Sequence, residues 1–237
     1  RVNEAALFAA RRDHAKVEQR DFTESIDKIL LGAERQVVMT DADRRRTAYH
    51  ESGHALVGML TPGADPVRKI SIIPRGQALG VTLSTPDSDR YNYRREDLVA
   101  KIKVALGGRA AEKVVFDEIS TGAESDIQNL TQVARGMVGR WGMSDAVGPI
   151  AVTDGRQDGL LLPGAMPASE PTQELVDKEV RRIVDQAEDE VVALLQQERG
   201  RLEALATALL ERETLDQPEA YEIADVPPAG AEPVVAD

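Results

Sequence analysis

The stretch around which the rest of this chain is interpreted reads TAYHESGHALV, residues 47–57. It contains the pattern His-Glu-x-x-His, formed by His50, Glu51 and His54. On a helix, residues four apart share a face, so the two imidazoles can bind one metal ion while Glu51 reaches toward a water on that metal. The pattern predicts a helix that carries a zinc site of the hydrolytic type.

The segments on either side of this pattern set the expected ends of the helix. Thr40 or Asp41 can cap a helix that runs to about Leu60, and the dipeptide at residues 62–63, Pro-Gly, can stop it. Gly53 in the interior costs about 1 kcal/mol of helix propensity relative to Ala. A glycine at this point indicates that another element packs closely against the helix.

Further along the chain the apolar pattern changes period and then becomes helical again. Residues 67–73 and 81–83 predict two short strands that flank a glycine-containing loop. Amphipathic stretches predict further helices at 96–116, at about 123–141 and at about 171–210 with a break at Gly200. The pair Gly107-Gly108 lies inside the first of these helices, where it favours close approach of a neighbour.

The two ends of the chain are less regular. Residues 1–32 show helical spacing, with Asp21 as the expected cap of a second helix, and they begin in mid-pattern without a methionine, which suggests a piece of a longer protein. The stretch from about Ala224 lacks periodicity. With aromatic residues at 3% and abundant helix formers, the sequence predicts a mainly α fold with a small β-hairpin or sheet beside the motif helix.

Composition excludes several classes of protein. The absence of cysteine rules out disulfides and thiolate metal sites, so imidazoles and carboxylates must hold any metal. The net charge of −12 argues against a nucleic-acid binder. Residues 151–237 carry 7 Lys or Arg against 20 Asp or Glu, which we interpret as a solvated helix face and an acidic tail. We find no run of eighteen apolar residues, no secretory leader and no GxxxxGK[ST] phosphate loop.

The third protein ligand of a catalytic zinc remains open at this point. His14 lies in a charged run far upstream and is assigned no role, and Val57 and Leu60 stand where a metzincin would need Gly and His. Two carboxylates are left. Asp126 is equally consistent with a helix cap and a ligand, whereas Glu112 is more consistent with orienting an imidazole N–H than with binding the metal.

Several blocks, taken in order, resemble the peptidase domain of the FtsH family, the membrane-anchored ATP-dependent zinc metalloproteases. They are HESGH at 50–54, IPRG at 73–76 with ALG at 78–80, GGRAAE at 107–112, STGA at 120–123 with Asp126, and GMSD at 142–145. Their order and spacing are far more specific than the His-Glu-x-x-His pattern alone. The opening residues 3–11 resemble the end of the helical lid of that family's AAA ATPase module.

The resemblance implies roles for individual residues. His50, His54 and Asp126 would bind one Zn²⁺ per chain, and Glu51 would be the catalytic carboxylate. Glu112 stays a candidate for the supporting role described above. The substrate would add as a strand along the cleft, with candidate contacts at Ile72, Ile73, Gly80 and Val81.

The resemblance also implies an organisation and a function. Residues 1–32 would be the end of the AAA lid, 33–215 the zinc metallopeptidase domain, and 216–237 an acidic, disordered tail. The whole protein would be a homohexameric endopeptidase that degrades unfolded or membrane proteins, with this domain on the cytoplasmic side of the inner membrane. ATP and the membrane would be engaged only through segments absent here. The alternative is a non-catalytic, zinc-stabilised helical scaffold for oligomer assembly.

Overall fold

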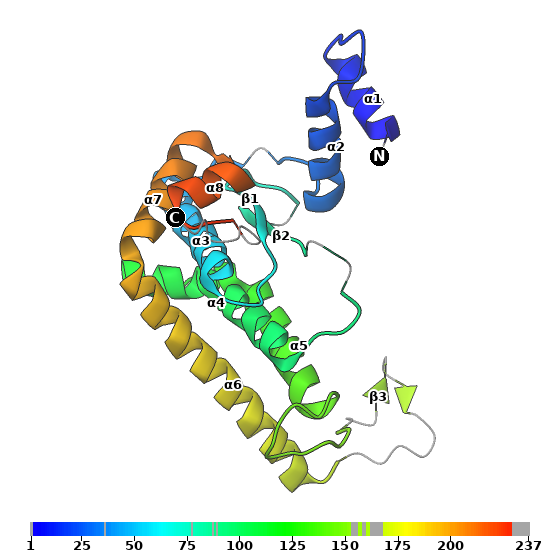
Figure 1. Ribbon diagram of the computed structural model, residues 1–237, viewed down its shortest axis with the longest axis vertical. Helices are drawn as coiled ribbons and strands as arrows, with labels where there is room; N and C mark the ends of the chain where they lie inside the picture. Colours follow the sequence, from blue (N-terminus) through cyan, green and yellow to red (C-terminus); the bar gives the residue numbers. More distant parts are fainter. Residues whose placement is uncertain are drawn as a thin grey trace, which may run out of the picture.

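The computed structural model describes residues 2–35, 37–76, 78–86, 88, 90–152, 156–157, 160–161 and 168–228. Its helices are α1 (Val2–Arg11), α2 (Gln19–Leu31), α3 (Asp41–Leu60), α4 (Arg95–Phe116), the short 3-10 turn η1 (Thr121–Ala123), α5 (Glu124–Gly139), α6 (Glu170–Gln197), α7 (Arg199–Arg212) and α8 (Gln217–Ile223). Its strands are β1 (Val67–Ser71), β2 (Val81–Ser84), β3 (Arg156–Gln157), β4 (Leu160–Leu161) and β5 (Thr214–Asp216). The predicted mainly α fold with a small sheet is confirmed (Figure 1).

Helix α3 is the central element of the fold. Thr40 caps it by accepting a hydrogen bond from the Asp43 N–H at 3.1 Å, and the chain turns away after Leu60 through Gly63, whose φ is +85°. Every residue from 48 to 58 is buried, because α4, α7 and β1 surround the helix. Polar side chains on a helix buried on all sides are expensive unless they are paired, so those of this stretch mark a site.

Helices α3 and α4 cross at contact distance through facing glycines. A Cβ added to Gly53 would lie 2.3 Å from the carbonyl oxygen of Gly107, and a Cβ added to Gly107 would lie 2.6 Å from the carbonyl oxygen of Gly53. Only residues without a side chain permit backbones to approach this closely. The close neighbour predicted for Gly53 and for the paired glycines is therefore confirmed, and each is the other's neighbour.

The sheet beside α3 has the order β2-β1-β5, and both pairings are antiparallel. Ile70 is opposite Thr82 on one side and opposite Leu215 on the other. The predicted pair of strands is present. Strand β5 was not predicted, because a run of three residues is too short to show a strand pattern. In the described part of the chain, the edge of β2 that faces away from β1 has no partner strand.

The C-terminal helices cover the outer side of this core. Figure 1 shows the long α6 running beside α4 and α5, followed by α7, which packs on α3. The break between them falls at Glu198, so the expected break at Gly200 is wrong by two residues and that glycine lies in the first turn of α7. Among the described helices, none is long and apolar enough to cross a membrane.

The segment expected to be a disordered tail from residue 216 begins with ordered structure. It forms helix α8, whose Tyr221 is 3% exposed and accepts a hydrogen bond from the Val67 N–H at 3.3 Å. That part of the prediction is wrong, because an acidic composition hid three residues, Ala220, Tyr221 and Ala224, that join the core. The expected disorder of residues 229–237 lies outside the described residues.

Helices α1 and α2 pack against each other at the N-terminal end (Figure 1). The expected cap at Asp21 is wrong, since α2 begins at Gln19 with Glu18 as its cap residue. Asp21 instead reaches back and accepts a hydrogen bond from the Glu18 N–H at 2.9 Å. The sequence correctly indicated that Asp21 takes part in capping this helix, but Asp21 lies in the first turn and the helix begins two residues before it.

Candidate metal centre and active site

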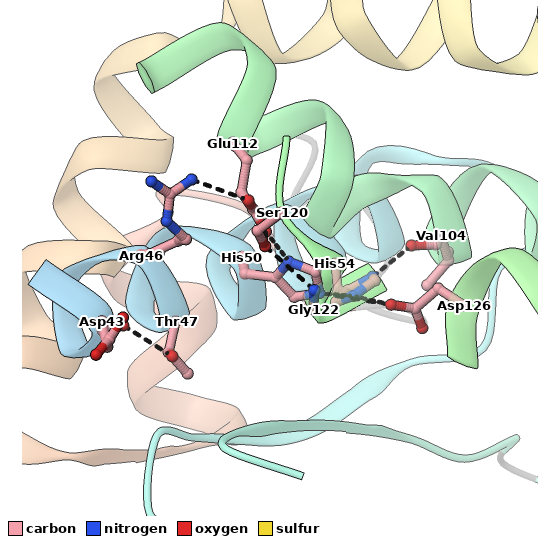
Figure 2. Close-up of polar contacts among 10 residues, drawn as sticks. All are labelled: Asp43, Arg46, Thr47, His50, His54, Val104, Glu112, Ser120, Gly122 and Asp126. Atoms are coloured by element: carbon pink, nitrogen blue, oxygen red, sulfur yellow. Dashed lines mark hydrogen bonds and ion pairs between the residues drawn. The ribbon is translucent and has the colours of Figure 1, made fainter. Parts of the chain in front are cut away.

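The two histidines of α3 meet the first turn of α5. Three atoms form a triangle: the Nε2 atoms of His50 and His54 are 3.1 Å apart, and Oδ2 of Asp126 lies 3.4 Å from each of them (Figure 2). In the described part of the chain, this is the group of histidine and carboxylate side chains that can hold a metal ion. Residues 72 positions apart are thus brought together because α5 begins beside the crossing of α3 and α4.

The far nitrogen of each imidazole is fixed by a separate acceptor on α4. Nδ1 of His54 lies 2.7 Å from the carbonyl oxygen of Val104, and Nδ1 of His50 lies 2.8 Å from Oε1 of Glu112 (Figure 2). A carbonyl oxygen can only accept, so Nδ1 of His54 carries the proton. With both Nδ1 atoms donating, each Nε2 atom presents the lone pair that a metal requires once it carries no proton.

Glu112 is itself held on all sides. Its carboxylate accepts hydrogen bonds from Ser120 Oγ at 3.1 Å and from Arg46 Nη1 at 3.2 Å, and Arg46 also contacts the exposed Glu118 at 2.9 Å. The Glu112 side chain is 2% exposed. It therefore contacts the outer nitrogen of His50 and stays outside the triangle.

Opposite charges are concentrated at the triangle. Burial alone would lower the pKa of His50, but hydrogen bonds to Asp126 and Glu112 outweigh burial and raise the pKa to about 10. Burial also disfavours the charged form of Asp126, yet hydrogen bonds from the two imidazoles hold the pKa of that carboxyl well below its usual range. Asp126 is consequently an anion throughout the neutral range, and a metal ion binding here must displace a proton from His50.

Glu51 projects from α3 toward β2. Its side chain is buried, and burial is the main reason that the pKa of this carboxyl is raised. Thr82 Oγ1 lies 2.7 Å from Oε2 of Glu51 and 3.0 Å from the Glu51 carbonyl oxygen. A buried carboxyl with a raised pKa beside a candidate metal centre has the properties of a general base.

A cleft of about 1140 Å³ gives access to these groups. It is bordered by α3, α4, β2 and the start of α5, and it is lined by the triangle, Glu51 and Glu112. Gly108 lies against His50, since a Cβ there would lie 2.4 Å from Nε2 of His50. The backbone of α4 is thus in contact with the imidazole ring.

The structure divides the four residues expected to contact a peptide. Gly80 and Val81 line the cleft, whereas Ile72 is 2% exposed in the core and its N–H donates to the carbonyl oxygen of Glu213. Ile73 likewise does not line the cleft; its N–H donates to Ser71 Oγ. Ile72 and Ile73 follow β1, which is the central strand and has partners on both edges, whereas Val81 begins β2 at the edge of the sheet. Peptide contact at any of the four residues stays a prediction.

Several contributors, Ser120 among them, were given no role in the sequence analysis. Arg46 could have been found, because it lies four residues before His50 and so shares its helix face. Thr82 could be suspected only once the register of β2 was known, since it is 31 residues from Glu51. Val104 acts through its backbone carbonyl, which no side-chain pattern reveals.

Comparisons with known proteins identify the family of this chain. A family model described as peptidase family M41 matches residues 37–223. The chain is 65% identical over 94% of its length to "ATP-dependent zinc metalloprotease FtsH 3" of Conexibacter woesei, of which it covers 30%. It is 52% identical over 94% of its length to "ATP-dependent zinc metalloprotease FtsH" of Thermobaculum terrenum, of which it covers 35%.

The chain spans about a third of the length of these curated relatives. The matched range 37–223 contains the complete triangle, Glu51 and both strands β1 and β2. It extends past the predicted domain end at 215 and includes α8, in agreement with the packing of Tyr221. The chain therefore belongs to peptidase family M41.

Proposed function

We propose that this chain is a zinc-dependent endopeptidase domain in which His50, His54 and Asp126 bind the metal. The observation that carries the proposal is the triangle, whose edges are 3.1, 3.4 and 3.4 Å. Tetrahedral zinc with bonds of about 2.0–2.1 Å separates its ligand atoms by about 3.3 Å. The donor set of two imidazoles and one carboxylate is also a zinc set.

The same donor set supports a catalytic role for the metal over a structural one. Structural zinc sites are closed by four protein ligands, whereas catalytic sites keep one position open. The described residues bring three ligands together at the edge of a cleft, and Glu112 is turned to the outer nitrogen of His50. This arrangement supports the enzyme and speaks against the scaffold that the sequence left as an alternative.

Zinc bound at the triangle would supply Lewis acidity to a water molecule and to a peptide carbonyl. Glu51 accepts a proton from the attacking water, whose oxygen forms a bond to the carbonyl carbon. The C–N bond then breaks and the proton passes from Glu51 to the leaving amine. Hydrolysis thus needs no covalent enzyme intermediate, and the buried carboxyl with its raised pKa is suited to both transfers.

Peptide binding is proposed along β2. Its outer edge has no partner among the described strands, and Gly80 and Val81 line the cleft next to Glu51. An extended peptide can pair with such an edge through main-chain hydrogen bonds. These bonds require an extended backbone but depend little on which side chains the peptide carries. The substrate class is therefore an unfolded or extended polypeptide.

The test is cleavage of casein by the wild type and by Glu51→Gln, with zinc per chain measured in both. We expect the wild type to lose cleavage on chelation and recover it with zinc, and Glu51→Gln to keep zinc but cleave at least about a thousandfold more slowly. Glu211→Gln, at an exposed position of α7, is the matched control. Undiminished cleavage by zinc-loaded Glu51→Gln would refute the proposal.

For the longer protein, we propose a membrane-anchored, ATP-dependent protease that acts as a homohexamer at the inner membrane, with this domain in the cytoplasm. The support is the likeness to relatives named ATP-dependent zinc metalloproteases. ATP would be bound by an AAA module, of which residues 1–32 would be the end of the lid. Sedimentation of this chain tests whether the peptidase domain assembles by itself, since six copies of a 25.8 kDa chain differ widely from one.

A further inference from the structure

The carboxylate of Glu51 is held between two residues of the β2 segment. In the part of the chain that the structure describes, its hydrogen-bond donor is Thr82, at 2.7 Å from Oε2. Thr82 has one hydroxyl proton, and the Glu51 carbonyl oxygen is the more distant of its two acceptors, at 3.0 Å. A threonine in a strand has a stiff χ1, so this donor is oriented before any substrate arrives.

Gly80 closes the other side of the same carboxylate. A Cβ at this position would lie 2.7 Å from Oε1 and 2.8 Å from Cγ of Glu51, and 2.8 Å from the methyl carbon of Thr47. Residues two apart in an extended segment point to the same face, so Gly80 and Thr82 both turn toward α3. The absent side chain at 80 makes room for the carboxylate, and the hydroxyl at 82 fixes its rotation.

We propose that Thr82 is a positioning residue for the reaction: its hydroxyl aims Glu51 at the attacking water from the strand along which the peptide is bound. The inference rests on the proposed function. In this proposal β2 has two roles: the outer edge of the strand pairs with the peptide, and Thr82 on its inner face orients Glu51. Peptide and base are then placed by the same four-residue strand, which fixes their relative position.

The test compares Thr82→Ser with Thr82→Ala, measuring kcat and KM for casein and zinc per chain. Both variants lack the methyl group and they differ only in the hydroxyl, so their ratio isolates the hydrogen bond. We expect both to keep zinc, Thr82→Ser to keep most of kcat, and Thr82→Ala to lower kcat by about tenfold to a hundredfold with KM little changed. Thr131→Ala, at a half-buried position of α5 where the hydroxyl donates to the Ile127 carbonyl oxygen of the same helix, is the control and should match the wild type.

Two kinetic results would overturn the inference while leaving the proposed function intact. One is equal kcat in the Ser and Ala variants, and the other is a change confined to KM, which would make Thr82 a peptide contact. Loss of zinc in Thr82→Ala alone would also overturn it, because the hydroxyl would then support the fold of the metal site. A wild type without zinc-dependent cleavage would refute the proposed function, and this inference with it.

Discussion

The two histidines of α3 are held from two points on α4 by different kinds of acceptor. At the His54 end the acceptor is the Val104 backbone carbonyl, whereas at the His50 end it is the Glu112 side chain, supported by Arg46 and Ser120. A backbone acceptor is fixed once α4 has formed. A side-chain acceptor is fixed only as well as its own partners hold it, so the His50 end is the one that substitution can change.

The largest effect on the His50 end, in zinc binding and in the free energy of unfolding, is expected from Gly108→Ala. The new Cβ would lie 2.4 Å from Nε2 of His50, so the ring must move or α3 and α4 must separate. We expect loss of stoichiometric zinc and a free energy of unfolding lower by about 1–3 kcal/mol. Metal analysis and denaturant unfolding measure both.

Gly200→Ala is the matched control for that substitution. Gly200 also lies in a helix, but a Cβ there meets no atom within 4 Å. The same change should raise the free energy of unfolding by about 0.4–1 kcal/mol, because it restricts the unfolded chain. If both variants behave alike, the packing of the imidazole on α4 does not constrain the site.

Glu112→Ala should weaken zinc binding by about tenfold to a hundredfold without abolishing it, because the ligand His50 loses the acceptor that orients it. Competition with a chelator measures the affinity, and saturating zinc should restore most of the cleavage. Glu118→Ala removes a carboxylate that is 67% exposed and contacts Arg46 through Nη2, the nitrogen that does not bind Glu112, so it should bind zinc like the wild type. Equal affinities for the two variants would show that the His50 end needs no support.

The pH dependence of the free energy of unfolding tests the charge arrangement at the His50 end in the absence of metal. The raised pKa of His50 means that its contribution to stability is fully present below about 6.5 and is lost as pH rises toward about 10. With chelator present, the free energy of unfolding should fall across that window, by at most about 1.4 kcal/mol per pH unit. With zinc bound the proton is displaced, so this slope should disappear. A metal-free protein with constant stability from pH 7 to 10 would contradict the charge arrangement.

The smallest effect is expected from Arg46→Met. The Arg46 side chain is 31% exposed, and partly exposed ion pairs contribute up to about 1 kcal/mol, so zinc affinity should fall by about twofold to fivefold. Arg45→Met is the control, since Arg45 lies over the Tyr49 and Phe116 rings and leaves Glu112 untouched. A larger loss than that of Glu112→Ala would reverse the order of support proposed here.

Local sequence signals predicted the ends of α3 closely. Elements that depend on contacts with residues remote in sequence were not predicted. The cap at Thr40 or Asp41, the stop near Gly63 and the buried glycines can all be recognised within one segment, and they predicted the helix and its close neighbour correctly. Strand β5 and helix α8 could not be predicted, because their structure depends on pairing with β1 and packing of Tyr221, which are remote in sequence.

The candidate site shows the same division. His50 and His54 follow from one motif, while spacing alone left Asp126 divided between cap and ligand until the family resemblance favoured the ligand. In the structure Asp126 lies in the first turn of α5, 3.4 Å from both imidazoles. Thr82 and the Val104 carbonyl contribute through strand register and backbone position, which a single sequence does not encode in a readable pattern.

The most direct test of the metal site is zinc per chain together with casein cleavage for Asp126→Ala and Glu124→Ala. Both substitutions remove a carboxylate from the first turn of α5, but only Asp126 belongs to the triangle. We predict that Asp126→Ala holds no zinc and cleaves nothing, while Glu124→Ala keeps both properties. An Asp126→Ala variant that retains one zinc per chain and normal cleavage would contradict the account.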